Sequence, residues 1–111
     1  MIKIQIRKTN VEISDVLRMH VERRLGLALA RFADRIGRVI VRFSHADGEG
    51  GGSHECCEIQ VGLQPVRVLA EDVDRDLFIA VNHATERASR SVARALEREA
   101  PITRREPNRS G

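Results

Sequence analysis

The sequence contains no tryptophan and no tyrosine, and phenylalanine occurs at only three of its 111 positions. Proteins that read single-stranded nucleic acids stack the bases on exposed aromatic rings. All three phenylalanines, Phe32, Phe43 and Phe78, occupy plausible core positions. The sequence therefore argues against recognition by base stacking, and any binding to nucleic acid must depend on phosphate contacts and on shape.

Cysteine is equally scarce, because Cys56 and Cys57 are the only two and are neighbours in the chain. They cannot cross-link distant segments, so we expect a reducing, cytoplasmic setting. On a strand, successive side chains point to opposite faces, which prevents both thiols from holding one metal ion. His54 lies nearby, but no second ligand pair stands at metal-binding spacing. We predict a small buried thiol beside an exposed one, with no metal and no cofactor.

The sequence also lacks a membrane-spanning apolar run, a signal peptide's apolar stretch and a recognisable catalytic motif. The glycines at 48 and 50–52 are not followed by the Lys-Ser/Thr of a phosphate-binding loop. His20, His45 and His83 have no Ser, Cys or paired carboxylate at motif spacing. We therefore expect no catalytic residues, no small-molecule substrate and no membrane partner.

Charge is unevenly distributed along the chain. Residues 1–46 hold ten Lys/Arg and four Asp/Glu, whereas residues 47–76 hold two Arg and eight acids. Residues 77–111 are basic again, with seven Arg and four acids. Basic charge thus gathers in the two predicted helical segments, which favours a polyanionic partner.

The most informative stretch runs from Asp74 to Ala100. Its apolar residues recur at three- and four-residue spacings, which is typical of an amphipathic helix. Four arginines fall within an arc of roughly 80° on another side of this helix. Such a row can bind successive phosphates, because each guanidinium group offers two parallel N–H donors to phosphate oxygens. The alternative interpretation is a solvent-exposed helix face whose positive charge is offset by nearby glutamates. The apolar residues are Leu77, Val81, Ala84, Ala88, Val92 and Ala95, and the arginines are Arg87, Arg90, Arg94 and Arg98.

The remaining patterns predict one more helix and four strands. The helix begins after Ser14, a good N-cap, and runs to about Asp34, with Gly37 as its stop signal. Alternating residues predict strands at 2–7, 38–43, 56–63 and 66–70, with a flexible loop at 45–53. Residues 71–74 supply acidic capping candidates for the second helix. The core stripe of the first helix is expected at Leu17, Val21, Leu25, Ala28 and Phe32.

The resulting order, β-α-β-β-β-α, predicts an α+β fold with a four-stranded mixed sheet. The helical crossover predicts parallel pairing of the first two strands, and the short later links predict antiparallel pairing. Strands with one apolar face need one cover, so both helices should pack on one face of the sheet. Residues 1–100 are predicted to form a single domain, followed by a flexible tail at 101–111.

Residues 11–21 (VEISDVLRMHV) and 76–82 (DLFIAVN), together with this element order, resemble the ribosome hibernation-promoting factor family. The family is also called ribosome-associated inhibitor A, protein Y or ribosomal subunit interface protein. Its second helix typically opens with Asp-Met-Tyr-x-Ala-Ile-Asp/Asn, followed by basic residues at the spacing of Arg87, Arg90 and Arg94. The likeness covers about residues 1–98, although Phe78 replaces the usual Tyr and Arg replaces most of the expected Lys.

The resemblance implies a non-catalytic translation inhibitor of the short type, active in stationary phase or stress. Such a factor binds the small ribosomal subunit and its rRNA and occludes the channel for messenger and transfer RNA. By position, the resemblance implies that seven basic side chains contact the rRNA. These are Lys8, Arg24, Arg31, Arg87, Arg90, Arg94 and Arg98.

Two other functions stay open at the level of sequence. One is a general binder of double-stranded RNA, which would use the same basic helix faces. The other is a protein-interaction module whose working surface is the acidic region 47–76.

Overall fold

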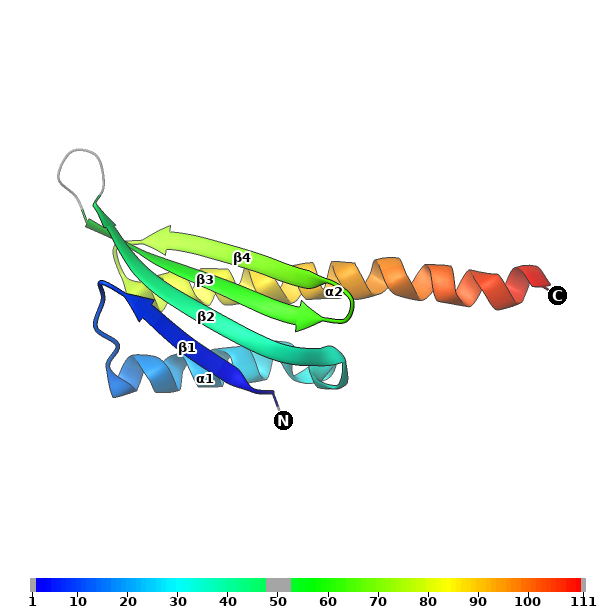
Figure 1. Cartoon of the computed structure of the whole chain (residues 1–111), viewed down its shortest axis with the longest axis horizontal. Helices are drawn as coiled ribbons and strands as arrows, with labels where there is room; N and C mark the ends of the chain where they lie inside the picture. The colour runs from blue at the N-terminus through cyan, green and yellow to red at the C-terminus, as the bar shows by residue number, and fades with distance from the viewer. Residues whose placement is uncertain (1, 48–52, 111) are drawn as a thin grey trace.

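The computed structural model describes the backbone of residues 2–47 and 53–110, and the side chains of residues 2–45 and 54–98. The predicted order of elements is confirmed, with one added 3-10 helix, η1, after the first α-helix (Figure 1). The elements are β1 (Ile4–Thr9), α1 (Asp15–Leu29), η1 (Ala30–Arg35), β2 (Ile36–Asp47), β3 (Ser53–Leu63), β4 (Arg67–Asp74) and α2 (Leu77–Ser110).

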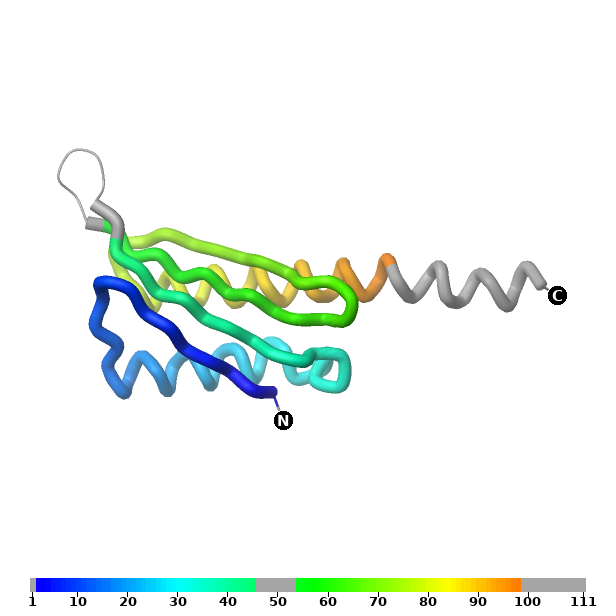
Figure 2. The backbone as a smooth tube through the Cα atoms, viewed as in Figure 1, coloured from blue at the N-terminus to red at the C-terminus, as the bar shows by residue number. Residues whose placement is uncertain are grey.

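The four strands form one mixed sheet in the order β1-β2-β3-β4. The sheet is mixed because β1 runs parallel to β2, whereas β3 runs antiparallel to both β2 and β4. Figure 2 shows α1 returning the chain from the end of β1 to the start of β2. The predicted α+β architecture is therefore confirmed, including the crossover.

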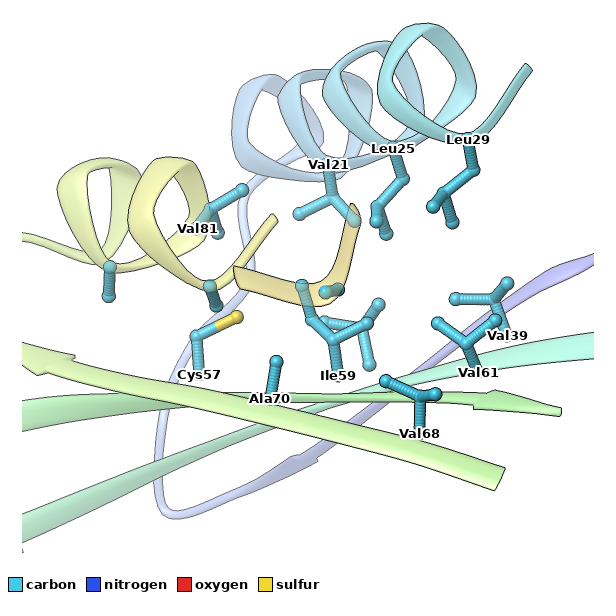
Figure 3. Packing of buried hydrophobic residues seen from close by; sticks show 14 of the residues in the cluster. Val21, Leu25, Leu29, Val39, Cys57, Ile59, Val61, Val68, Ala70 and Val81 are labelled. Carbon is cyan, nitrogen blue, oxygen red and sulfur yellow. The ribbon is translucent and has the colours of Figure 1, made fainter. Parts of the chain in front are cut away.

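Both helices pack on one face of the sheet, and the core lies between the two layers (Figure 3). The strands contribute alternate residues, as their period of two requires. Fully burying one such aliphatic side chain is worth about 1.5–3 kcal/mol. The largest buried side chains are Phe43, Leu25, Leu29, Ile59, Val21, Val39, Val41, Val61, Val81 and Val92.

The end of α1 differs from the sequence prediction. The α-helix stops at Leu29, and the tighter η1 replaces the last turn that was predicted to reach Asp34. Because η1 rotates by a different angle per residue, Phe32 is only partly buried, although it still packs against the core. Leu29 is fully buried in its place, while Ala28 and Phe32 are half-buried. Ser14 caps α1 as predicted, accepting a hydrogen bond from the Leu17 N–H at 3.0 Å.

The start of α2 corrects a second prediction. Glu71, Asp72 and Asp74 were capping candidates, but all three lie in β4. Asp76 caps the helix, because its Oδ1 accepts from the N–H of Phe78 at 2.8 Å. β4 continues beyond the predicted end at residue 70 because its alternation, with Asp72 facing the helices, persists through the acidic residues.

α2 also extends further than predicted, to Ser110 instead of about Ala100. The flexibility of residues 101–111 stays a prediction, and the loop glycines 48 and 50–52 lie outside the described residues. Among the described residues, no helix combines the length and the apolar character needed to cross a membrane.

Candidate nucleic-acid interface

The two helices lie side by side and meet along a seam that two hydrogen bonds hold. At one end, His20 Nε2 donates to Asn82 Oδ1 at 2.8 Å. At the other, the Ser89 hydroxyl donates to the backbone carbonyl of Ala28 at 3.3 Å. On α1 these contacts come from residues eight positions apart, so Arg24 projects midway between them at helical spacing.

A groove of about 380 Å³ opens along the seam around Arg24. Arg24 lines it from α1 and Arg90 lines it from α2, so the groove carries two guanidinium groups on opposite walls. Glu86 is the only acidic residue in its lining. An anionic group entering the groove would meet donors from both helices, and guanidinium forks match phosphate oxygens.

Two polar atoms at the groove are buried without any hydrogen-bond partner. One is the hydroxyl of Thr85, a residue only 1% exposed, and the other is Nε of Arg24. Buried hydroxyl and guanidinium groups are normally paired, so these two atoms at one groove are exceptions to the usual pattern. The sequence analysis missed Thr85, although its spacing from Val81 and Ala88 placed it beside the apolar stripe of α2.

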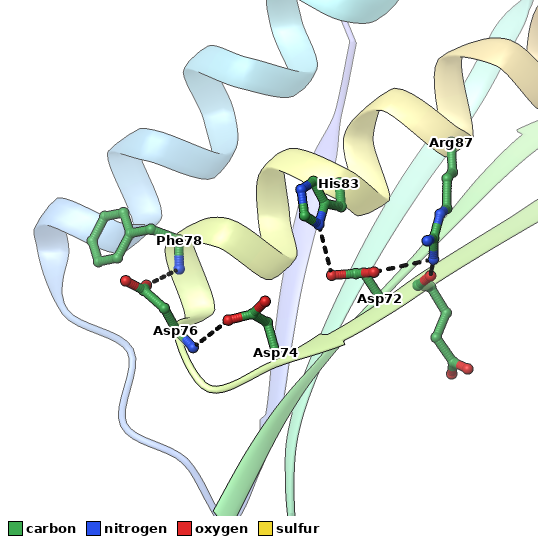
Figure 4. Close-up of polar contacts among 7 residues, drawn as sticks. Asp72, Asp74, Asp76, Phe78, His83 and Arg87 are labelled. Atoms are coloured by element: carbon green, nitrogen blue, oxygen red, sulfur yellow. Dashed lines mark hydrogen bonds and ion pairs between the residues drawn. The ribbon is translucent and has the colours of Figure 1, made fainter.

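The side chain of Arg87 points in a different direction from the other arginines of the predicted row on α2. Its Nη1 donates to the backbone carbonyl of Glu71 at 2.7 Å and lies 3.1 Å from Asp72 Oδ1. His83 Nδ1 donates to the other oxygen of Asp72 at 3.2 Å (Figure 4). Asp72 is 8% exposed, so these two side chains hold α2 on the edge strand β4. Arg87 therefore already has an internal structural role.

We expect Arg87→Gln to lower the stability of the protein more than Arg90→Gln does. Loss of Arg87 leaves the buried Asp72 carboxylate with His83 alone and should lower the free energy of unfolding by about 1 kcal/mol. Loss of the exposed Arg90 should change it by less than about 0.5 kcal/mol. Urea unfolding of both variants measures this difference. Equal stability of the two proteins would contradict the structural role of Arg87.

The remaining predicted contacts are spread along the molecule. Arg31, in η1, stacks its guanidinium 4.5 Å from the centre of the Phe32 ring. Arg94 and Arg98 are exposed further along α2, and Arg94 donates to the Ser91 hydroxyl at 3.4 Å. Lys8, at the far end of β1, forms an exposed ion pair with Glu12 at 3.7 Å. Only Arg24 and Arg90 share one groove, so the seven residues do not form a continuous row.

The cysteines lie on opposite faces of β3, as predicted. Burial raises the pKa of the Cys57 thiol to about 12. The pKa of Cys56 is raised as well, first by burial and then by the nearby Glu71 carboxylate. A raised pKa keeps both groups as neutral thiols near neutral pH, which disfavours nucleophilic and metal-binding chemistry.

One group of possible metal ligands arises that the sequence analysis did not consider. Ligand atoms of Asp72, Asp74 and His83 lie within 4.8 Å of one another. Both Asp72 oxygens already bind His83 and Arg87, and Asp74 Oδ1 accepts from the Asp76 N–H at 3.0 Å. These contacts explain why the three side chains lie close together, because they link β4 to α2.

The chain matches the family described as sigma 54 modulation protein / S30EA ribosomal protein over residues 4–100. The chain belongs to this family. The family assignment suggested by the sequence resemblance is thereby confirmed. No curated protein matches the chain in sequence.

Two solved structures have a similar fold. A ribosomal subunit interface protein from Coxiella burnetii aligns with a TM-score of 0.73 and 18% identity, covering 86% of this chain and 99% of that one. The N-terminal domain of Protein Y from Thermus thermophilus aligns with a TM-score of 0.64 and 29% identity, covering 85% of this chain and 98% of that one. The first likeness, at its low identity, supports the fold alone.

In this member of the S30EA family, Phe78 packs near the start of α2 against a residue of α1. Its ring lies 5.1 Å from the His20 ring, centre to centre, at an interplanar angle of 55°. His20 in turn donates to Asn82, so the three residues join the N-terminal turns of α2 to α1. The contact helps to set the spacing of the two helices on which the groove depends.

Proposed function

We propose that this protein is a non-catalytic, cytoplasmic translation inhibitor that binds the small ribosomal subunit. It would contact rRNA phosphates through the faces of α1 and α2 and occlude the channel for messenger and transfer RNA in stationary phase or stress. Membership of the S30EA ribosomal protein family, which the chain matches over residues 4–100, supports binding to the ribosome. No cofactor or small-molecule substrate is part of the proposal.

The observation that carries the proposed rRNA contact is the groove between the helices. Arg24 and Arg90 supply two cations, and the Thr85 hydroxyl and Arg24 Nε beside them have no hydrogen-bond partner among the described residues. A phosphate in the groove would meet charge of the opposite sign, and it would reach the buried Thr85 hydroxyl only if the groove opened slightly on binding. Arg31, Arg94 and Arg98 would extend the contact along the exposed helix surface.

Cosedimentation with purified small subunits at graded salt tests the proposal. Each phosphate neutralised by a side chain releases counterions, so the affinity should fall steeply as salt rises. Cell-free translation should be inhibited over the same range of protein concentration. Binding that does not respond to salt, or no binding at low salt, would refute the proposal.

A general affinity for double-stranded RNA is the nearest alternative, because it would use the same basic faces. Adding an unrelated RNA duplex in excess to the cosedimentation separates the two. A general binder would leave the subunits for the duplex, whereas a ribosome-specific factor would stay bound.

The protein-interaction alternative, based on residues 47–76, is less well supported. Every acidic side chain of residues 54–76 already holds an internal contact, and three of them, Glu55, Glu58 and Asp72, pair with basic side chains, which reduces the negative charge offered to a partner. Asp47 and Glu49 lie outside the side chains that the structure describes. The six engaged residues are Glu55, Glu58, Glu71, Asp72, Asp74 and Asp76.

Thr85→Val provides a sharper test, because it should change stability and binding in opposite directions. Thr and Val have similar helix propensities, and removing a buried unpaired hydroxyl should stabilise the free protein by about 1 kcal/mol. Binding to small subunits should weaken roughly tenfold if the hydroxyl bonds to a phosphate. Urea unfolding and cosedimentation measure the two effects. A variant that is more stable and binds as well as the wild type would remove Thr85 from the interface.

A further inference from the structure

The face of the sheet that looks away from the helices is uncovered in the described part of the chain (Figure 1). Strand alternation places every second residue on this open face, including Arg38 and Ile40 of β2, Gln60 and Gly62 of β3, and Arg67 of β4. None of these residues took part in the groove between the helices. The open face therefore presents a second surface on the opposite side of the molecule.

On this face, one row of residues that lie side by side across the four strands carries only positive charge. In the strand register Arg38 pairs with Gly62, and Gly62 pairs with Arg67. Lys3 precedes Ile4, the partner of Val39, and so lies beside Arg38 on β1. Within the described residues, no ion pair or side-chain hydrogen bond engages Lys3, Arg38 or Arg67, and no acidic residue stands in the row.

A hollow of about 450 Å³ lies in this row, between the two arginines. Two strand spacings of about 4.8 Å separate the backbones of Arg38 and Arg67, which is close to 10 Å. The position between them is Gly62, so no side chain fills the gap. A Cβ at Gly62 would lie 3.4 Å from the Arg38 carbonyl oxygen, an ordinary contact. The strand would thus accept alanine here, and the backbone does not require glycine.

The next row supplies an apolar wall and an amide. Ile40 is 7% exposed even though no helix covers it, because its neighbours on the sheet enclose it. Gln60 Oε1 accepts a hydrogen bond from Arg42 Nη1 at 3.5 Å, which leaves the amide N–H groups of Gln60 to donate. Both residues line the hollow. The hollow therefore combines two guanidinium groups with an apolar surface and a neutral donor.

We propose that this hollow is a second RNA-binding site, which takes one nucleotide with its phosphate held between Arg38 and Arg67. The ribose would lie against Ile40, within reach of the Gln60 amide. Because the site is on the face opposite the helices, one molecule of the protein bridges two RNA segments. This goes beyond the proposed function, which uses the helix groove alone.

RNA fits the hollow better than a free anion does, because the apolar wall and the amide donor add contacts that only a larger ligand with polar edges uses. Guanidinium groups bind phosphate and carboxylate alike, so a carboxylate-bearing peptide is the competing ligand that the test has to exclude. Free inorganic phosphate would touch the arginines and leave Ile40 and Gln60 without a partner. These differences define the comparison ligands for the test.

Titration of the ¹⁵N-labelled full chain with hexauridylate, followed by NMR, tests the site without ribosomes. The amide signals of Arg38, Gly62 and Arg67 should shift saturably, separately from those of Ser89 and Arg90 at the helix groove. Hexaglutamate and inorganic phosphate should each bind the sheet site at least tenfold more weakly than hexauridylate. Tighter or equal binding of either ligand, or no shift at Gly62 with RNA, would overturn the proposal.

Two variants distinguish a binding site of defined shape from non-specific electrostatic attraction by the basic residues. Arg38→Gln with Arg67→Gln should weaken hexauridylate at the sheet at least tenfold and leave the helix signals unchanged. Gly62→Ala keeps the charge but places a methyl group in the hollow, and should weaken it at least threefold. A folded Gly62→Ala protein with wild-type affinity would overturn the proposal, since charge alone would then explain the binding.

The helix variant Arg24→Gln with Arg90→Gln tests RNA binding at the sheet separately from the proposed function of the helix groove. It should remove binding to small subunits while the sheet signals still shift with hexauridylate. If the wild-type protein binds no ribosomal subunit at all, the sheet titration still supports or refutes the second site by itself. Loss of the sheet shifts in this folded helix variant would refute two independent sites.

Discussion

Replacing Arg24 and Arg90 together by glutamine is expected to weaken binding to small ribosomal subunits by at least about 100-fold at low salt. Each guanidinium lost from a phosphate removes a charge-assisted hydrogen bond worth about 1.5–3 kcal/mol, and about 1.4 kcal/mol corresponds to a factor of ten. The slope of log affinity against log salt should shrink by up to about 1.8, which is about 0.9 for each contact on duplex-like RNA. Cosedimentation at several salt concentrations measures both quantities.

The matched control is Arg18→Gln with Arg75→Gln, which removes the same charge from outside the groove. Both arginines are exposed, and within the described residues neither side chain makes an ion pair or hydrogen bond. We expect this control to lose much less affinity than the groove variant, in proportion to net charge alone. Equal losses in the two double variants would mean that the groove has no special role. Inhibition of cell-free translation should follow binding in both proteins.

The largest effect on stability is expected for Leu25→Ala. Leu25 is fully buried and packs from α1 onto the sheet (Figure 3). Truncating a buried leucine leaves a cavity and costs about 2–5 kcal/mol, a large share of the stability of a domain this size. The midpoint of thermal unfolding should fall by at least about 8 °C, at roughly 4–8 °C for each kcal/mol. Thermal unfolding monitored by circular dichroism measures the change.

Leu27→Ala is the control, because it removes the same atoms from the same helix on its exposed side. Leu27 is 73% exposed, so its truncation should alter the free energy of unfolding by less than about 0.5 kcal/mol. A small loss in both variants would show that α1 is not held by the core as described.

The fold was largely predictable because its signals are local. Alternation along residues 2–7 and 38–43, and the spacing of Leu17, Val21 and Leu25, follow from the repeats of two and 3.6 residues that backbone geometry imposes. The crossover and the short links then favoured the parallel and antiparallel pairings that the structure has. Element ends were less predictable. η1 replaces the last turn of α1, and β4 runs on through acidic residues, because tertiary packing decides where a regular backbone stops.

The candidate site was predictable in part. The sequence by itself determined that four arginines gather on one side of the second helix, since an angle around a helix axis depends only on residue spacing. It did not determine which neighbour lies at each angle. Only the tertiary structure turned Arg87 toward Asp72 on β4, brought Arg24 and Arg90 to one groove, and left the Thr85 hydroxyl unpaired beneath it. These are contacts between segments far apart in the chain, and they follow from the packing of whole elements, which no local pattern encodes.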